Sequence, residues 1–291
     1  MLTLAYLGPT GTYTEAAALA YCNWLEDTCG RKGKLVPYPS ISQTLEALLQ
    51  RTCDVAVIPI ENSIQGSVTV SLDSFWEKER LQVQQALVLP IHHALISRGA
   101  GLEEITTVYS HPQALAQCQH WLEEQLSQVT LHSTNSTAEA LQYLQDPQVG
   151  AIASERAAEL YDLPILAHGI NDHRDNCTRF WVVRGSKDGI ELPQAPGPAY
   201  LSLAFSLPQN SPGALLNPLQ VLANYGINMT RIESRPTKRL LGEYLFFVDV
   251  EAPKDEGILS EAIAALSEYT EILKIFGSYT VLAVGNSPLP G

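Results

Sequence analysis

The chain has few cationic side chains for its length. Its 291 residues include 18 Lys and Arg against 31 Asp and Glu, which gives a formal net charge of −13 at pH 7. This charge opposes long-range attraction to nucleic acid or to an anionic membrane, and no basic stripe offsets it. We therefore expect no nucleic-acid partner and no membrane partner. An anionic ligand has to be captured by a few local donors, so the place of each arginine is informative.

Disulfide and metal-site patterns are also lacking. The cysteines number five and lie at irregular spacings without a CxxC pair: Cys22, Cys29, Cys53, Cys118 and Cys177. This pattern argues against a disulfide framework and against a zinc site. His168 and His173 are five residues apart, which does not place them on one helix face, and we expect His92 and His93 to lie at a strand end. We expect reduced thiols, no metal and no cofactor.

Long hydrophobic runs and a targeting segment are absent as well. The longest apolar stretches have the length of a strand, and the first residues, MLTLAYLGPTGTYTE, lack a basic segment and a cleavage site. The sequence therefore predicts a cytoplasmic protein. With 45% apolar and 17% charged residues, the chain can bury a core, and its length allows two domains or one domain with a regulatory attachment.

A segment rich in proline and glycine, GSKDGIELPQAPGPAY at 185–200, divides the chain and predicts a linker. Before it, helix-like segments alternate with strand-like runs at 2–7, 55–60, 81–89, 149–154 and 180–184, which is typical of an α/β fold with a largely parallel sheet. After it we expect a strand at 201–207, a helix at 212–225, strands at 227–237 and 243–250, a helix at 260–269 and a strand at 273–280. This βαββαβ order is ferredoxin-like.

Several junctions between a strand and a helix carry helix-start residues. Thr12 with Glu15, and Ser136 with Glu139, have capping-box spacing, and Pro112 is a favoured first helical residue after Ser110-His111. Helix N-termini bind carboxylates and phosphates without lysine, and ligands of α/β sheets gather at the carboxyl ends of strands. Each cap can equally bind nothing beyond its own side chains. Together they favour an anion site at this edge of the sheet.

One further segment, DNCTRFWVVRG at 175–185, places a hydroxyl and a guanidinium at the start of an apolar run. An always-charged group at a buried strand end requires a partner. Thr178 and Arg179 are therefore either a salt-bridged strand end or part of a site.

Six segments together resemble prephenate dehydratase with a C-terminal ACT domain. They are YLGPTGTYTEAAA near the start, VIPIENSIQGSV from Val57, VYSHPQALAQC from Val108, DNCTRF from Asp175, GALL from Gly213 and ESRP from Glu233. The resemblance implies an α/β catalytic domain at 1–184 with two lobes of the class II periplasmic-binding-protein type. Lobe 1 is expected at 1–77 and 170–184, lobe 2 at 78–169, the linker at 185–199 and the ferredoxin-like ACT domain at 200–283.

The resemblance also implies a reaction, the decarboxylating dehydration of prephenate to phenylpyruvate in phenylalanine biosynthesis, by a monofunctional lyase without a fused chorismate mutase. Hydroxide is a poor leaving group, and a donor to it typically contributes about 10²–10⁴-fold. The family motif assigns that place to Thr178, as an oriented donor with the proton source open. Arg174 and Arg179 are the cations best placed for a substrate carboxylate, although Arg179 can instead hold the backbone of the motif.

Other residues match the family's cleft. The resemblance places Asn62, Ser110 and Gln117 among the catalytic residues with Thr178 and Arg179. It implies substrate contacts at Thr12, Tyr13, Ser63, Ser136, Thr137, Asn176 and Phe180.

The resemblance further implies feedback inhibition by phenylalanine bound between two ACT domains. The residues expected to bind it are Gly213, Ala214, Leu215, Leu216, Asn228, Glu233, Ser234, Arg235 and Pro236. Ser211 and Pro212 are expected to begin the helix that carries GALL. Taken alone, ESRP predicts only an exposed turn. A homodimer through the ACT domains, and a homotetramer, are expected.

Two other functions fit the same residues. Arogenate dehydratase performs the same chemistry on the substrate with an amino group in place of the keto group. A binding protein that senses amino acids without catalysis is the alternative of another class.

Overall fold

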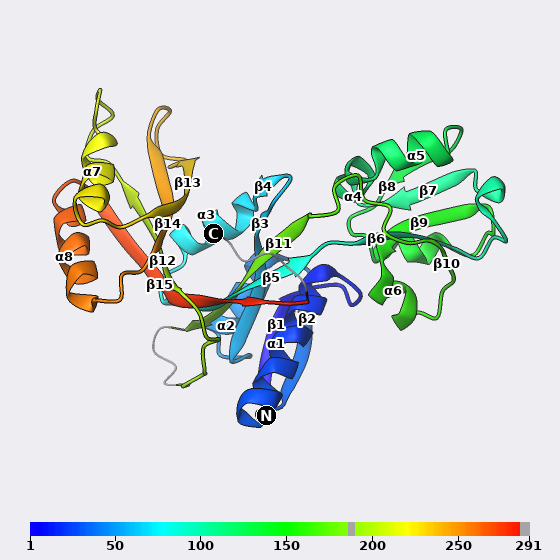
Figure 1. The fold of residues 1–291 in the computed structure, drawn as a ribbon, viewed down its shortest axis with the longest axis horizontal. Helices are drawn as coiled ribbons and strands as arrows, with labels where there is room; N and C mark the ends of the chain where they lie inside the picture. Colours follow the sequence, from blue (N-terminus) through cyan, green and yellow to red (C-terminus); the bar gives the residue numbers. More distant parts are fainter. Residues whose placement is uncertain (186–189, 286–291) are drawn as a thin grey trace.

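The computed structural model describes residues 1–185 and 190–285. Figure 1 shows three bodies in a row, with a central lobe between a second lobe at one end and the C-terminal domain at the other. The predicted α/β class is confirmed. Within the described residues, no helix is long and apolar enough to cross a membrane.

The central lobe, lobe 1, is built on a mixed sheet in the order β5-β11-β3-β1-β2, with β4 paired to β3. Strand β1 runs parallel to β2 and β3, whereas β11 runs antiparallel to β3 and β5. The sheet is therefore mixed where we expected it to be largely parallel, because β11 brings the chain back from lobe 2. The elements are β1 (Leu2–Leu7), α1 (Tyr13–Cys29), β2 (Gly33–Tyr38), α2 (Ile41–Leu49), β3 (Val55–Asn62), β4 (Gly66–Ser67), α3 (Thr69–Glu77), β5 (Leu81–Pro90) and β11 (Cys177–Gly185).

Helix α1 shows how the local sequence builds this lobe. The hydroxyl of Thr12 accepts a hydrogen bond from the Glu15 amide, and the Glu15 carboxylate accepts one from the Gly11 amide, so a cap of the predicted type forms. The helix ends at Gly30, whose φ of 70° is left-handed. Its buried side chains recur at helical spacing and join the core formed by β1 and β3: Ala17, Ala18, Tyr21 and Leu25.

Lobe 2 has its own five-stranded sheet in the order β10-β6-β9-β7-β8. Separate clusters of buried apolar side chains lie on its two faces. The elements are β6 (His93–Ser97), η1 (Leu102–Glu104), β7 (Thr107–Ser110), α4 (Pro112–Gln117), α5 (Gln119–Gln125), β8 (Thr130–Ser133), η2 (Glu139–Tyr143), β9 (Val149–Ser154), α6 (Glu155–Leu160) and β10 (Ile165–Ala167).

The C-terminal domain has the predicted βαββαβ order. Its strands pair antiparallel in the order β13-β14-β12-β15. The elements are β12 (Ala199–Ser206), α7 (Leu216–Asn224), β13 (Met229–Pro236), β14 (Tyr244–Glu251), α8 (Glu256–Ser267) and β15 (Ile272–Ala283).

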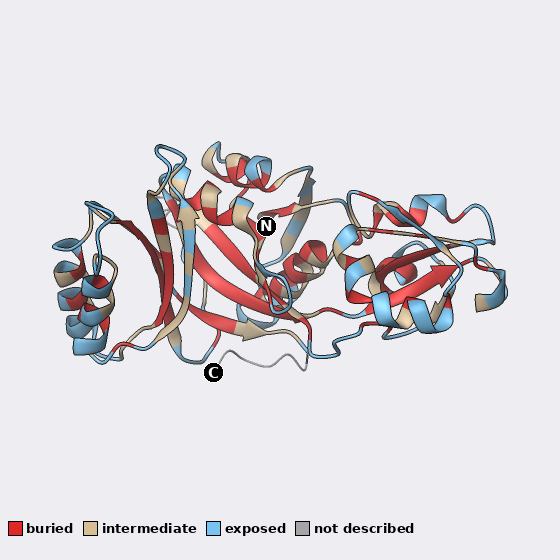
Figure 2. Ribbon diagram, turned by 90° about the horizontal axis from the view of Figure 1, so that it is seen from above, coloured by how far each residue is buried: buried red, intermediate tan, exposed pale blue. Residues whose placement is uncertain are grey.

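One continuous sheet joins the C-terminal domain to lobe 1. The end of β15 pairs in parallel with β5, so buried strands run from one body into the other (Figure 2). The approach is close at Gly277, where a Cβ atom would lie 2.8 Å from the backbone oxygen of Val83, and where φ is 132°. Glycine is therefore the residue that lets β15 reach lobe 1.

Two boundaries differ from the expectation. The chain passes into lobe 2 after Pro90 and not near residue 77, because β5 pairs with β11 in the lobe 1 sheet. Helix α7 begins at Leu216 and not at Pro212, because Gly213 has a φ of 82°, which a right-handed helix does not accept. Ser211 is consequently not the N-cap of this helix.

The predicted linker is packed against lobe 1 where it is described. Residues 186–189 lie outside the described residues. From Ile190 onward the segment contacts the lobe 1 core, Ala195 is buried, and the Gln84 side chain donates to the Leu192 carbonyl oxygen. This part is an ordered connection with the composition of a linker.

Candidate active site

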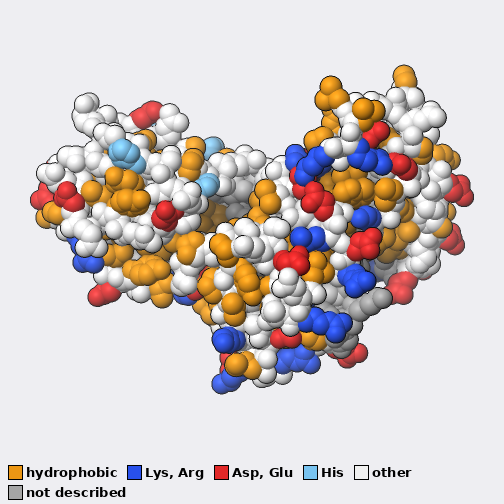
Figure 3. All heavy atoms as spheres, turned by 180° about the vertical axis from the view of Figure 1, so that it is seen from behind, with side chains coloured by type: hydrophobic (Ala, Val, Ile, Leu, Met, Phe, Trp, Pro, Cys, Tyr) orange, Lys and Arg blue, Asp and Glu red, His pale blue; other side chains and the backbone are white. Residues whose placement is uncertain are grey.

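The two lobes enclose a cavity of about 330 Å³. Figure 3 shows the surface hollowed between lobe 2 and the rest of the molecule. Contacts across this opening join the loop before α1 to lobe 2: Ser154 donates to the Gly11 carbonyl oxygen and Tyr161 to that of Thr10. The lining residues are Leu7, Tyr13, Thr14, Ile41, Pro59, Asn62, Val68, Ile91, His93, His111, Gln113, Ala114, Gln117, Thr137, Thr178 and Phe180.

Thr178 and Asn62 stand side by side on the lobe 1 wall of this cavity. They face each other in the antiparallel pairing of β11 with β3, and both are buried. The register shifts between Arg179 and Phe180, a bulge that lets Pro59 and Asn62 both line the cavity although they are three residues apart. The order of the strands thus creates a pair that is 116 residues apart in sequence.

The Asn62 amide orients the Thr178 hydroxyl. Its Oδ1 accepts from the backbone amides of Ile64 and Gln65, both at 3.1 Å, and these groups can only donate. The Nδ2 group therefore faces Thr178 and donates to its Oγ1 over 3.0 Å. Since Thr178 accepts this bond, its own proton remains for a group in the cavity.

A buried chain of amides continues from Asn62 to lobe 2. Asn62 Nδ2 donates to Asn176 Oδ1 over 2.8 Å, and Asn176 Nδ2 donates to Gln117 Oε1 over 2.9 Å. Gln117 Oε1 also lies 3.0 Å from His93 Nε2. Gln117 Nε2 is buried and has no hydrogen-bond partner among the described residues. Because Gln117 lines the cavity, this donor is available to a bound molecule.

His93 is a neutral member of this chain. Burial lowers the pKa of His93 to about 4, against its usual 6.5, so the ring is uncharged at neutral pH. The Nε2 atom carries the proton, because Gln117 Oε1 can only accept, and Nδ1 lies 3.0 Å from the hydroxyl of Tyr13. The His92 carbonyl oxygen lies at the same hydroxyl, so the one proton of Tyr13 is shared between two acceptors, and burial raises the pKa of Tyr13 well above its usual value. Tyr13 of lobe 1 is thereby bound to lobe 2.

Sequence reasoning missed His93 as a site residue. It expected a strand end, which is correct, since β6 begins at His93. The only signal in the sequence was a histidine at the carboxyl side of an apolar strand, and its partners come from segments 24 and 80 residues away.

No lysine or arginine lines the cavity among the described residues. The polar lining groups are neutral amides, hydroxyls and imidazoles, and burial lowers the pKa of His111 as well. The cavity is thus a mainly apolar space with a few hydrogen-bond donors on its walls.

Several predicted site residues do not line the cavity but form hydrogen bonds within the segments around it. Thr12 caps α1, and the Ser136 hydroxyl accepts from the Glu139 amide at the start of η2, a 3₁₀ turn. Ser110 is fully buried and donates to the Ile152 carbonyl oxygen. Ser63 accepts from the Cys177 amide, which helps to hold the segment before Thr178.

The two predicted cations also lie outside the cavity. Arg174 is exposed. Arg179 points to the opposite face of β11 from Thr178, because successive side chains of a strand alternate. Its Nη2 lies 2.6 Å from Glu61 Oε2 and 2.8 Å from Asp249 Oδ2 of the C-terminal domain. Arg179 is therefore a salt-bridged residue at the strand end, which was one of the two predicted alternatives. The neighbouring carboxylates raise the pKa of Arg179.

The residues predicted to bind phenylalanine form two groups. Gly213, Ala214, Leu215 and Leu216 precede or open α7, which has no side-chain cap. The ESRP segment does not form a turn but ends β13, with Ser234 and Pro236 exposed and Arg235 bound to Asp73 of α3 through two hydrogen bonds. Asn228 donates to Glu251. No hydrogen bond between described residues joins the two groups within one chain.

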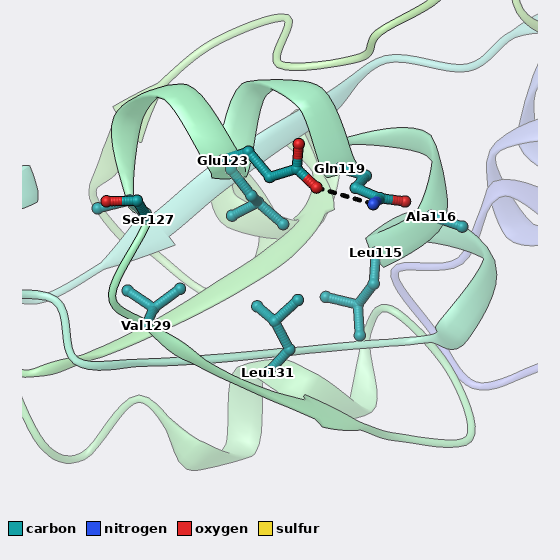
Figure 4. A pocket seen from close by; sticks show the side chains of 9 residues that line it. Leu115, Ala116, Gln119, Glu123, Ser127, Val129 and Leu131 are labelled. Atoms are coloured by element: carbon teal, nitrogen blue, oxygen red, sulfur yellow. Dashed lines mark hydrogen bonds between the residues drawn. The ribbon is translucent and has the colours of Figure 1, made fainter.

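Another concave region lies on lobe 2. A groove on lobe 2 between α4, α5 and β8 is lined mostly by apolar side chains, with one hydrogen bond between Gln119 and Glu123 (Figure 4). Within the described residues no group of three or more His, Cys, Asp or Glu side chains is placed to hold a metal ion. The cavity between the lobes is therefore the candidate active site.

Comparison with known proteins identifies the family of the chain. Residues 4–188 match the family model "Prephenate dehydratase" and residues 202–268 match "ACT domain". The chain is 39% identical to the bifunctional chorismate mutase/prephenate dehydratase of Aquifex aeolicus, over 96% of this chain and 73% of that protein. It is 35% identical to the prephenate dehydratase of Lactococcus lactis, over 98% of this chain and 99% of the relative.

A solved structure is similar over the whole chain. The prephenate dehydratase of Arthrobacter aurescens in complex with L-Phe superposes with a TM-score of 0.84 at 30% identity, covering 100% of this chain and 93% of that one. The chain belongs to the prephenate dehydratase family and carries a C-terminal ACT domain.

Proposed function

We propose that this chain converts prephenate to phenylpyruvate, carbon dioxide and water, and that phenylalanine bound to the ACT domain inhibits the reaction. The observation that carries the catalytic part is a Thr178 hydroxyl, oriented by Asn62, on the wall of an apolar cavity without a cationic side chain among its described lining.

The reaction removes the charge of one carboxylate, and a mainly apolar cavity favours this change. The bond from the ring to its carboxylate breaks, its electron pair enters the ring to complete the aromatic system, and the bond to the hydroxyl breaks at the opposite ring carbon. The carboxylate loses its charge as it becomes carbon dioxide. A cation beside it would stabilise the ground state more than the transition state, so an apolar environment favours this step.

The departing hydroxide gains charge and needs donors. Two donors line the cavity at the two ends of the amide chain. They are the Thr178 O–H and the unpartnered Gln117 Nε2 group. Donors aimed at developing charge stabilise the transition state selectively. On lobe 2, His111, Gln113 and Thr137 are available to the carboxylate of the pyruvyl side chain.

The test is phenylpyruvate formation from prephenate, with Thr178→Ala beside the wild type. We expect the variant to lose about 10²–10⁴-fold in kcat with little change in KM, because the lost interaction forms with the leaving group. Thr178→Ser keeps the hydroxyl and should recover much of the rate. The matched control is Thr106→Ala, which removes the same group from an exposed loop of lobe 2.

The outcomes separate the candidate functions. A wild type that is inert on prephenate and turns over arogenate would reassign the substrate, and inertness on both with phenylalanine still bound would support the sensing protein. Equal rates for Thr178→Ala and the wild type would contradict the role of the hydroxyl.

The regulatory part rests on the ACT domain and on the solved relative in complex with L-Phe. The start of α7 has no side-chain cap, and the GALL and ESRP segments would complete one site when two ACT domains pair. Large apolar side chains are exposed on this domain: Leu216, Ile232, Leu240, Leu241 and Tyr244. Burial of such a surface against a second copy supports a homodimer through the ACT domains, and pairing of two dimers gives the homotetramer.

A further inference from the structure

Two neighbouring strands of the catalytic domain each carry a pair of adjacent residues whose side chains point to opposite faces of the sheet. Asn62 lies opposite Thr178, and Glu61 lies opposite Arg179, in the pairing of β3 with β11. Asn62 and Thr178 line the cavity, whereas Glu61 and Arg179 point to the other face of the sheet. Each of these cavity residues is therefore joined by one peptide bond to a residue on the opposite face of the sheet.

The surface behind the wall is occupied by the ACT domain. Arg179 Nη2 lies 2.6 Å from Glu61 Oε2 and 2.8 Å from Asp249 Oδ2 on β14. Arg231 on β13 lies 3.4 Å from the same oxygen of Asp249 and 3.7 Å from Glu61 Oε1. We call these four residues, Glu61, Arg179, Arg231 and Asp249, the interdomain ion cluster. Two acidic and two basic groups alternate in it, one of each sign from each domain.

Three of the four side chains in the cluster are shielded from solvent. The Arg231, Asp249 and Arg179 side chains are 8%, 2% and 12% exposed, whereas that of Glu61 is 33% exposed. Asp249 is also held by the hydroxyl of Ser202, which donates to its other oxygen. Separation of the partners leaves buried charges without compensation, so the cluster is either formed or broken and does not stretch gradually.

The cluster also reaches the ESRP segment. Ser67 of β4 accepts from Arg231 Nη2 over 2.8 Å and donates to Glu233 Oε2 over 3.1 Å. Strand β4 is itself paired with the Glu61-Asn62 dipeptide. A displacement of β13 against lobe 1 must therefore move these strands or break polar contacts with them.

We propose that the interdomain ion cluster is the element through which phenylalanine bound at the ACT domain alters the active site, and that Arg179 is a positioning residue for Thr178. This rests on the proposed function. Phenylalanine changes the place of β13 and β14, Asp249 and Arg231 transmit the change to Arg179 and Glu61, and the peptide bonds to Thr178 and Asn62 carry it into the cavity. The hydroxyl donor then loses its alignment with the leaving group.

The test is Asp249→Asn, which keeps the shape and the acceptor for Ser202 and removes the charge shared by the two arginines. Three quantities are measured on the full-length protein: prephenate turnover without effector, phenylalanine binding by calorimetry, and the factor by which saturating phenylalanine lowers turnover. Glu61 still holds Arg179 in this variant, so we expect turnover and phenylalanine affinity close to those of the wild type. The inhibition factor should fall by about fivefold or more.

The matched control is Glu77→Gln on α3, which removes a carboxylate from another ion pair between the domains, with Lys238, and leaves the ESRP segment untouched. It should keep the inhibition factor of the wild type. If the cluster served only folding, Asp249→Asn would not lower the inhibition factor while phenylalanine affinity and turnover stayed unchanged. If Asp249→Asn does not fold, Arg231→Lys tests the same link, because it keeps the charge and loses the fork that reaches Asp249 and Ser67.

The outcomes are distinct. A wild type that phenylalanine does not inhibit contradicts the proposed regulation together with this inference. An inhibited wild type with an equally inhibited Asp249→Asn contradicts only the inference and assigns the coupling to the continuous sheet of β15 and β5. Loss of inhibition in Glu77→Gln as well would overturn the specific role of the cluster.

Discussion

At the scale of single residues, the walls of the cavity are organised by groups that cannot change their hydrogen-bonding direction. Two backbone amides determine the orientation of the Asn62 amide, and this amide makes Thr178 an acceptor on one side and a donor on the other. At the far end of the amide chain, His93 Nε2 donates to Gln117, and a second proton on the ring would lie on Nδ1, which faces the Tyr13 hydroxyl. The contact between His93 and Tyr13 therefore depends on pH.

Protonation of His93 should destabilise the folded protein. In the unfolded chain a histidine binds a proton below pH of about 6.5, whereas burial lowers the pKa of His93 to about 4 in the folded state. Between these values the unfolded state binds more protons, so the free energy of unfolding decreases as the pH is lowered from about 6.5 to about 4, by about 3 kcal/mol from this group. His93→Gln should lack this share of the pH dependence in urea unfolding, whereas His173→Gln, at an exposed position, should retain it. Identical pH profiles for His93→Gln and the wild type would contradict the assignment.

At the scale of elements, the strand pairings bring distant segments together. Strand β11 between β3 and β5 unites the ENS and CTRF segments, and β15 beside β5 attaches the ACT domain. The second pairing requires that nothing project from residue 277, since the backbone of Val83 occupies that space.

Gly277→Ala should therefore lower stability by two separate effects. The φ of 132° strains a residue with a Cβ atom, and the Cβ would also meet the Val83 oxygen at 2.8 Å, so we expect a loss of about 2–3 kcal/mol, measured as a lower thermal midpoint. Gly226→Ala isolates the first effect, because Gly226 has a φ of 65° and no atom within 4 Å of the Cβ position. Its loss should be about 1 kcal/mol. Equal shifts for the two variants would show that β15 does not approach β5 this closely.

At the scale of the whole molecule, lobe 1 is the body that both other bodies contact. Lobe 2 contacts it at Tyr13, and the ACT domain continues its sheet and pairs with two of its charges, Glu61 and Arg179. The ACT domain leaves Leu240 and Leu241 exposed at 67% and 101%, which is a large apolar surface for a chain with so high a net charge.

The proposed pairing of ACT domains has a direct readout in mass. Light scattering should give at least twice the 31.8 kDa of one chain, and four times this mass for the homotetramer. Leu240→Glu together with Leu241→Glu should reduce the mass, since charges would then have to be buried in the interface. A mass of one chain for the wild type, with and without phenylalanine, would contradict the pairing.

The sequence by itself determined the elements and the chemistry of their ends. Alternating strands and helices, the Thr12 cap and the βαββαβ order depend on contacts within a few residues, and such contacts are readable from local patterns. The resemblance to the family likewise pointed to Thr178, Asn62 and Gln117. Boundaries were less accurate where a single glycine changed the backbone, as at Gly213.

Only the tertiary structure decided which side chains meet. Strand alternation sent Thr178 into the cavity and Arg179 to Asp249, 70 residues later in the chain, and no local pattern encodes that partner. The role of His93 likewise depends on Gln117 and Tyr13, which lie on different lobes. The physical reason is the same in each case, because burial and hydrogen-bond partners depend on which strands pair, and pairing is a property of the whole fold.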